Sequence, residues 1–351
     1  MAELTPMKKQ YNEIKEKYPD CMLFFRLGDF YEMFNDDAKT ASRELDLALT
    51  TRDRTVEDPE ERTPMCGVPY HAAEIYIAKL IAKGYKVAIC EQMEDPALAK
   101  GLVKRDVIRI ITPGTVTASS MLDERRSNYL CAVCLHPKQD RGGIAFCDAS
   151  TGEFCTAAFS KNAVEHILNE LGRFSPREAV LNQAAENEEI RKFLTGKLGS
   201  GVQMLEENFD RRRCENLLCR QFGVADSGEL GLGQTPHAVE ASGALLEYLI
   251  STQKADLSYL KAPELFAAGR YMELDYATRR NLELTESLRS GEKRGSLLWV
   301  LDKTRTPMGS RTLRAWLERP LLHPEPIRYR NQAVAELAEN SILREEVMHE
   351  L

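Results

Sequence analysis

A Gly28-Asp29 pair lies between two strongly apolar stretches near the start of the chain, and it limits the possible folds more than any other short feature. Glycine adopts positive φ without the Cβ clash that hinders other residues, so the backbone can bend sharply here. An aromatic side chain that follows such a turn can project from the body of the fold. Phe30 can then act as an apolar wedge between stacked bases, with the Glu32 carboxylate beside it. Wedging costs roughly a few kcal/mol per step, and least where a duplex is already mispaired.

The residue types alone also support a simpler interpretation, in which these aromatics fill the core of a small sheet. Phe24, Phe25 and Phe34 flank the same segment, and buried aromatics dominate protein cores. Composition favours the core, and both interpretations stay open at this point.

The chain as a whole has the composition of a soluble protein. Its 351 residues predict two or three domains, and no apolar run approaches the length of a membrane span. The N-terminus carries no secretory signal, and nine scattered cysteines fit a reducing cytoplasm. A net charge of −7 argues against a surface that coats nucleic acid everywhere. Local basic faces remain candidates, with solvated helix charges as the alternative, at Lys104-Arg105, Arg125-Arg126, Arg211-Arg212-Arg213 and Arg279-Arg280.

Hydrophobic periodicity predicts a compact α/β unit up to about residue 114. A helix capped by Thr5 is followed by a buried strand at 21–25, a helix at 37–45, a strand at 46–51, an exposed loop at 52–63, a helix at 72–82 and strands at 85–90 and 107–111. A polar connector occupies 115–127. Strand-like runs at 129–134, 143–147 and 153–159 then precede alternating helices and strands, including a strand at 178–181. This order predicts a layered α/β domain over 128–255. From 256 the pattern is helical, beginning with 271–284, and the chain stops at Leu351 within a helical pattern, so we expect a longer polypeptide.

The segment Arg26–Lys39, with its Phe-Tyr-Glu run, closely resembles the N-terminal signature of the MutS family of DNA mismatch-recognition proteins. The resemblance extends through nearly the whole chain, including the runs 64–71, 87–93, 109–115, 275–284 and 306–311. It implies that Phe30 stacks on a mispaired base from the minor groove and that Glu32 hydrogen-bonds that base, while Tyr31 packs inward. A carboxylate tolerates this contact only if the base presents an N–H or the carboxyl is protonated. The resemblance also makes Arg52 a possible DNA backbone contact.

For the fold, the resemblance implies a mixed α/β mismatch-recognition domain at 1–114, a linker at 115–127, a ribonuclease H-like connector at 128–255 and the beginning of an all-α core or lever domain at 256–351. The expected partners are duplex DNA with mismatches or small loops, a MutL-type protein through the connector, and a second copy in the full-length protein. We expect no membrane partner and a cytoplasmic, nucleoid-associated location in a bacterium. The family's ATPase site would lie beyond residue 351, so ATP and Mg²⁺ are expected only for the full-length protein.

Other candidate sites are weaker, and we expect no catalytic residue, ATP site, cofactor or metal in this chain. Residues 195–201 are glycine-rich but have the wrong spacing for a phosphate loop and no preceding strand. Cys131 and Cys134 are three apart in a strand-like run, so they point to opposite faces and cannot chelate together. The six histidines form no ligand-spaced cluster.

Asp148 carries the alternative function. It resembles the strand-borne acid of ribonuclease H-like enzymes, which need several carboxylates converging on two metals. A metal-dependent nuclease or a DNA-junction-processing protein is therefore the competing hypothesis, and it requires further acids beside Asp148.

Overall fold

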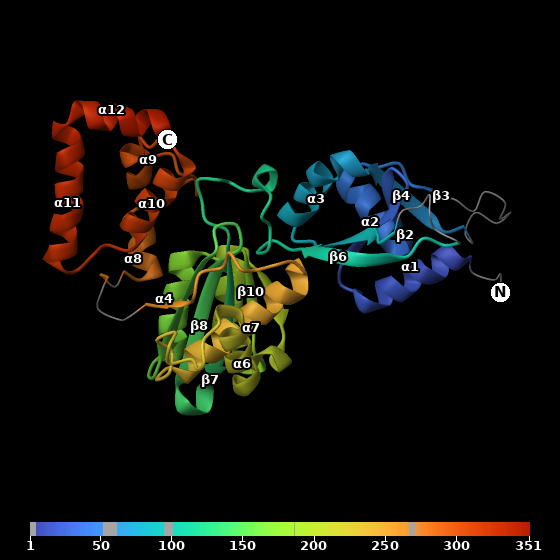
Figure 1. Cartoon of the computed structure of the whole chain (residues 1–351), viewed down its shortest axis with the longest axis horizontal. Coiled ribbons are helices and arrows are strands. Elements are labelled where there is room, and N and C mark those ends of the chain that lie inside the picture. The colour runs from blue at the N-terminus through green and yellow to red at the C-terminus, as the bar shows by residue number, and fades with distance from the viewer. Residues whose placement is uncertain (1–4, 52–61, 95–100, 186, 267–270, 273) are drawn as a thin grey trace.

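The structure is a computed structural model that describes residues 5–51, 62–94, 101–185, 187–266, 271–272 and 274–351. Within these residues the chain forms two six-stranded sheets, each packed with helices, followed by a group of helices (Figure 1). The predicted mixed α/β character is confirmed. None of the helices in the described ranges combines the length and apolar character needed to span a membrane.

The first sheet has the strand order β3-β4-β2-β1-β5-β6. Its strands are β1 (Met22–Leu27), β2 (Phe30–Phe34), β3 (Thr50–Thr51), β4 (Pro64–Pro69), β5 (Val87–Gln92) and β6 (Arg105–Ile111). Strand β1 pairs antiparallel with β2 and parallel with β5. The helices of this unit are α1 (Pro6–Lys17), α2 (Asn35–Leu45) and α3 (Ala73–Ala82). The side chain of Thr5 caps α1, as its sequence position predicts.

The two faces of the first sheet are covered by different helices because side chains alternate along a strand. Phe24 and Met33 pack with the buried residues of α2 and α3. Leu23 and Phe25 point the other way and pack with the buried face of α1. The sheet is therefore the middle layer of three.

The second sheet has the order β11-β10-β7-β8-β9-β12. Its strands are β7 (Tyr129–His136), β8 (Arg141–Asp148), β9 (Glu153–Phe159), β10 (Glu178–Leu181), β11 (Gly201–Met204) and β12 (Glu264–Leu265). Strands β7, β8 and β9 form an antiparallel meander, and β10 and β11 add parallel to β7. The helical elements around it are α4 (Ala163–Phe174), α5 (Glu188–Arg191), a π-helix (Lys192–Leu198), α6 (Arg211–Phe222) and α7 (Pro236–Gln253).

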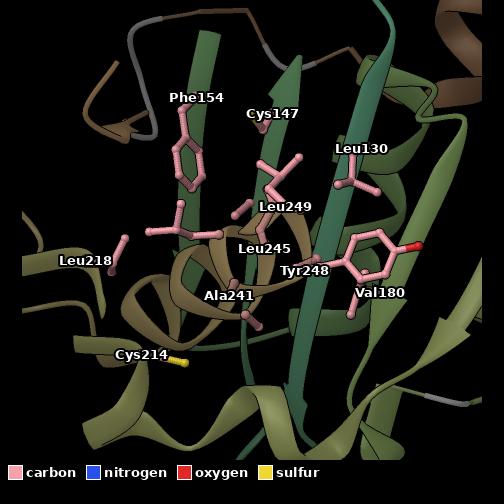
Figure 2. Packing of buried hydrophobic residues seen from close by; sticks show 14 of the residues in the cluster. Leu130, Cys147, Phe154, Val180, Cys214, Leu218, Ala241, Leu245, Tyr248 and Leu249 are labelled. Carbon is pink, nitrogen blue, oxygen red and sulfur yellow. The ribbon is translucent and has the colours of Figure 1, made fainter. Parts of the chain in front are cut away.

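Helices cover both faces of the second sheet. Helix α7 lies across one face, where Leu245 and Leu249 meet strand residues such as Leu130 and Val180 (Figure 2). The other face packs against α4 and the 188–198 helices. Strand β7 alternates accordingly, so Cys134 belongs to the α7 side and Cys131 to the α4 side. The prediction that these two cysteines face apart is confirmed.

The last part of the described chain is helical. It contains α8 (Tyr276–Asn281), α9 (Leu297–Leu301), α10 (Pro307–Glu318), α11 (Pro324–Glu339) and α12 (Ser341–Glu350). Helices α11 and α12 stand away from both sheets and bury no residue fully (Figure 1).

Two predicted elements were too long. Only Thr50–Thr51 of the strand expected at 46–51 is a strand, because Asp46 ends α2 in the left-handed conformation, with φ of 54°. The helix expected over 271–284 is confined to α8, since Tyr271 instead pairs with Leu321 in an isolated bridge. Strand β12 lies in the stretch expected to be helical and pairs with β9.

The first unit is joined to the second through buried polar contacts. The Glu178 carboxylate on β10 accepts hydrogen bonds from the Gly114 N–H at 3.0 Å, the Tyr248 hydroxyl at 2.7 Å and the Thr112 hydroxyl. Gln253, at the end of α7, donates to the Thr115 carbonyl at 2.9 Å. The backbone at 112–116 is thus fixed to the second sheet and its main helix.

Candidate functional site

The β1–β2 hairpin turns through two residues, Gly28 and Asp29. Gly28 has φ of +57°, a conformation that glycine adopts without strain. Leu27 and Phe30 pair directly across the turn, and the Tyr70 N–H donates to the Asp29 carbonyl at 2.9 Å. The turn is thus bonded to the end of β4, so the first residue of β2 sits on a fixed support.

Phe30 is the exposed member of an otherwise buried aromatic group. Its side chain is 46% exposed, whereas Phe24 and Phe25 are 0% exposed and Phe34 is 3% exposed. The core interpretation therefore holds for the flanking phenylalanines and fails for Phe30. The ring has the access to solvent that a wedge requires, and its role stays a prediction.

Glu32 lies two residues along β2, so it points to the same side of the sheet as Phe30. It is buried, at 7% exposure, and its cross-strand neighbour on β4 is Gly67. A Cβ at position 67 would come within 3.4 Å of the Glu32 Cγ and 3.2 Å of the Tyr31 carbonyl oxygen. The absent side chain at Gly67 leaves the room that the Glu32 side chain uses, a feature that the sequence interpretation missed.

Tyr31 packs inward on the opposite face, as the resemblance implies. Its hydroxyl donates to Glu91, which also lies 3.6 Å from Arg26. The Arg26 guanidinium stacks 3.7 Å from the centre of the Tyr70 ring. Burial, followed by the hydrogen bond to Glu91, raises the pKa of Tyr31 well above its usual range. These contacts fix β2 beneath the exposed ring.

The basic clusters divide between structural and exposed charges. Arg105 donates to the Arg26 carbonyl at 2.7 Å, and Arg279 donates to the Asn169 carbonyl at 2.8 Å. Arg126 pairs with Glu286, and Arg213 pairs with Glu247. Each cluster keeps an exposed charge, and these are Lys104, Arg125, Arg211, Arg212 and Arg280. Arg52 lies outside the described residues.

The alternative site at Asp148 is closed by the protein itself. Its carboxylate accepts hydrogen bonds from the Asn128 N–H at 3.0 Å, the Ser150 N–H at 2.9 Å and the Ser150 hydroxyl at 2.6 Å. Glu153 lies opposite on β9 and accepts from the Tyr129 hydroxyl at 2.8 Å. Among the described residues, Asp148 belongs to no group of three possible metal ligands.

The glycine-rich stretch 195–201 does not fit a phosphate. A phosphate loop follows a strand and opens a helix. Here the π-helix comes first, Gly199 ends it with φ of 67°, and strand β11 follows. The order of elements is reversed, so we assign no nucleotide to this stretch.

The fold also brings together a group that sequence spacing did not reveal. Cys134, His136 and Glu240 lie within 4.8 Å of one another, although Glu240 is more than a hundred residues away in the chain. The ring of His237 lies 4.6 Å from that of His136. The histidines have no ligand spacing along the sequence, and only the packing of α7 on β7 brings His136 and His237 together.

The fold and the hairpin define a class of protein with two helix-covered mixed sheets, an exposed aromatic on the first sheet and a helical continuation. Three family models match the chain in order, and they are MutS domain I over residues 5–120, MutS domain II over 128–261 and MutS domain III over 277–351. The chain belongs to the MutS family.

Relatives described as DNA mismatch repair protein MutS align along the whole chain. The protein from Acetivibrio thermocellus is 51% identical over 99% of this chain and 39% of its own length. The Ruminiclostridium cellulolyticum protein is 48% identical over 99% of the chain and 39% of its own length. The Alkaliphilus oremlandii protein is 45% identical over 100% of the chain and 40% of its own length. The chain thus spans about two fifths of the relatives' length. These comparisons do not support the nuclease hypothesis.

Proposed function

We propose that this chain recognises mispaired or unpaired bases in duplex DNA, as a step that initiates DNA mismatch repair. The observation that carries the proposal is the 46% exposure of Phe30 on a hairpin whose neighbouring phenylalanines are buried. An apolar ring held outside a sheet by a fixed turn can enter a base step that is already weakly stacked. Such a wedge detects deformability of the duplex and does not depend on its sequence.

Glu32 supplies the polar contact in this proposal. It shares a face of β2 with Phe30, so a base displaced by the ring would lie over its carboxylate. Since a carboxylate oxygen accepts hydrogen bonds, the base must present an N–H group. The burial of Glu32, at 7% exposure, limits its rotamers, and this restriction would make the contact selective.

For the remainder of the chain we propose the domain division 1–114, 128–255 and 256–351, with a linker at 115–127. A ribonuclease H-like topology for the middle domain is supported by its antiparallel meander β7–β9 and by β10 and β11, which are parallel to β7. An all-α core segment at the end is supported by helices α8 to α12.

The activities of the whole protein are proposals as well. We propose that the full-length protein uses ATP and Mg²⁺, dimerises and contacts a MutL-type partner through the middle domain. No residue of the stretch 195–201 fits the nucleotide, so we expect no ATP hydrolysis by the 351-residue chain.

Phe30→Ala tests the wedge directly. We expect the ratio of affinities for mismatched and matched duplexes to fall to near unity, because the ring supplies the discrimination. The ratio is measured by fluorescence anisotropy, with two duplexes that differ only at a central pair and at one salt concentration. Ile75→Ala is the matched control, since Ile75 is an apolar residue of the same domain with 64% exposure and lies on α3. An undiminished ratio in Phe30→Ala, or a wild-type ratio of one, would contradict the proposal.

Glu32→Gln tests the base contact. The amide keeps an oxygen acceptor and adds an N–H donor, so the order of preference among mismatches should change while the overall affinity remains. Binding to a panel of duplexes with different central pairs measures this. A general collapse of affinity would show that Glu32 supports the fold and does not contact the base.

A further inference from the structure

A compact group of sulfur, nitrogen and oxygen donors lies at one end of the second sheet, far from the β1–β2 hairpin in sequence. Cys134 and His136 are two residues apart on β7, so both point to the α7 side. Glu240 and His237 lie on the first turns of α7, three residues apart and on one face of the helix. Strand β7 and helix α7 thus contribute two side chains each to the same group.

Gly143 allows this approach. It pairs with Cys134 across β7 and β8, and a Cβ at this position would lie 2.0 Å from the His237 carbonyl oxygen. The backbone of α7 therefore rests directly on β8 at its N-terminal turn. Any larger residue would lift the helix and separate Glu240 from Cys134.

The donor atoms have the spacing of a metal site. The Cys134 Sγ lies 3.4 Å from the His136 Nε2 and 3.1 Å from the Glu240 Oε2, and the last two atoms are 3.0 Å apart. A tetrahedral zinc ion with bonds of about 2.0–2.3 Å separates its ligands by roughly 3.3–3.8 Å. Shifts of a few tenths of an ångström would therefore bring the three atoms to that geometry.

The surroundings of the group suit a bound ion. Cys134 and Glu240 are buried, at 1% and 8% exposure, while the His136 side chain is 38% exposed. An ion can thus enter beside His136 and be held by ligands in the interior. His237 contributes a further contact, because its Nδ1 lies 3.0 Å from the same Glu240 oxygen.

We propose that Cys134, His136 and Glu240 bind a zinc ion, with a water as the fourth ligand on the exposed side of His136. Sulfur, imidazole nitrogen and carboxylate oxygen are the ligands that zinc takes in proteins. On binding, the Cys134 thiol becomes a thiolate and its proton passes to solvent. His237 is a positioning residue, which donates from Nδ1 to Glu240 and orients that carboxylate.

The competing explanation is a hydrogen-bonded group without a metal. Burial and the neighbouring Glu240 carboxylate raise the pKa of the Cys134 thiol, so the metal-free thiol donates to Glu240. Burial acts to raise the pKa of the Glu240 carboxyl, but hydrogen bonds from His237, His136 and Cys134 together outweigh it and lower that pKa. Both states use the same side chains, and only metal binding distinguishes them.

The test is metal binding by the 351-residue chain after treatment with a chelator and dialysis. After zinc is added back and the excess removed, we expect one equivalent of zinc by elemental analysis. Cobalt added in place of zinc should give the absorption of a thiolate-bound tetrahedral ion. Cys134→Ser should abolish the thiolate-to-cobalt band, and His136→Asn should weaken zinc affinity at least about tenfold. Cys147→Ser is the matched control, because Cys147 is another buried cysteine that packs on the α7 side of the same sheet and is outside the donor group.

His136→Asn keeps the test decisive if the buried Cys134 variant fails to fold, since His136 is partly exposed. Circular dichroism checks the fold of each variant. His237→Ala should weaken zinc binding while the cobalt spectrum keeps its form, and His237→Asn should restore part of the affinity. Absence of stoichiometric zinc and cobalt binding by the wild type, or equal affinity in His136→Asn and wild type, would overturn the proposal.

Discussion

The two sheets differ in the burial of one aromatic residue, Phe30. In the second sheet Phe146 and Phe154 are almost fully buried, because helices cover both faces. In the first sheet the same layering buries Phe24 and Phe25, but the hairpin holds Phe30 at its tip with nearly half of its surface in solvent. The difference teaches that a side chain's position along a strand, and not its chemistry, decides whether it stabilises the fold or is available to a ligand.

The carboxylates of the second sheet show the complementary case. Glu178 and Asp148 are fully buried, and donors of the same chain occupy their oxygens. A carboxylate with three donors on its roughly four acceptor sites has little capacity left for a metal or a substrate. Its contribution is to the folded state, so substitution should lower stability before it changes any binding.

Substitution of two phenylalanines gives the largest expected contrast. Phe24→Ala should lower the free energy of unfolding by about 4 kcal/mol, because it leaves a cavity in the core. Phe30→Ala should lower it by about 0.5 kcal/mol, since the ring is half exposed and removal leaves no enclosed cavity. Urea unfolding followed by far-ultraviolet circular dichroism measures both. Equal losses of stability in the two variants would contradict the distinction between Phe24 as a core residue and Phe30 as an exposed one.

Glu178→Ala tests the closed carboxylate. Its loss leaves the Tyr248 hydroxyl, the Thr112 hydroxyl and the Gly114 N–H buried without their acceptor, and we expect a cost of about 3 kcal/mol. Glu178→Gln keeps one acceptor oxygen and should cost less. Urea unfolding gives the stability, and hydrogen exchange at Gly114 locates the change. Unchanged exchange at Gly114 in the alanine variant would contradict this account.

Asp302 extends the comparison to the C-terminal helices. Burial acts to raise the pKa of this carboxyl, but hydrogen bonds from Lys293, Thr304 and Ser310 outweigh it and lower the pKa well below its usual range. The stabilisation is therefore complete above the unfolded-state pKa of about 3.9 and is lost as the pH falls through the lower folded-state pKa. Asp302→Asn should cost about 2 kcal/mol at neutral pH and flatten the acid dependence.

Tryptophan fluorescence measures this effect locally, because both tryptophans of the chain, Trp299 and Trp316, lie on α9 and α10. The wild type should show a loss of structure in these helices below about pH 4. An acid transition of equal size in Asp302→Asn would show that another group is responsible.

The sequence predicted which helices and strands form better than where they end or which of them pack together. Strands β9 and β10 were predicted residue for residue, because their apolar runs are bounded by turn residues. The strand at 46–51 was overextended, since nothing in the sequence marks Asp46 as left-handed. The opposite orientations of Cys131 and Cys134 followed from the period of a strand.

The candidate sites show the same limit. The sequence set the Glu32 carboxylate beside Phe30 but did not predict strand β2, which puts both side chains on one face. The resemblance, and not composition, indicated an exposed ring. The space left by Gly67 depends on strand pairing, and the meeting of Cys134 with Glu240 depends on how α7 packs on β7. Neither contact is local, so no pattern within a short window could predict it.

The buried bonds at 112–116 have a mechanical consequence. Glu178 and Gln253 anchor this short backbone stretch, while Lys254 reaches the Val107 carbonyl of β6 at 3.0 Å. Slight flexing between the first two domains would strain several of these bonds at once. The first domain should therefore reorient only when these hydrogen bonds break together. A force applied to Phe30 would pass through the first sheet to β6 and from there to the second sheet.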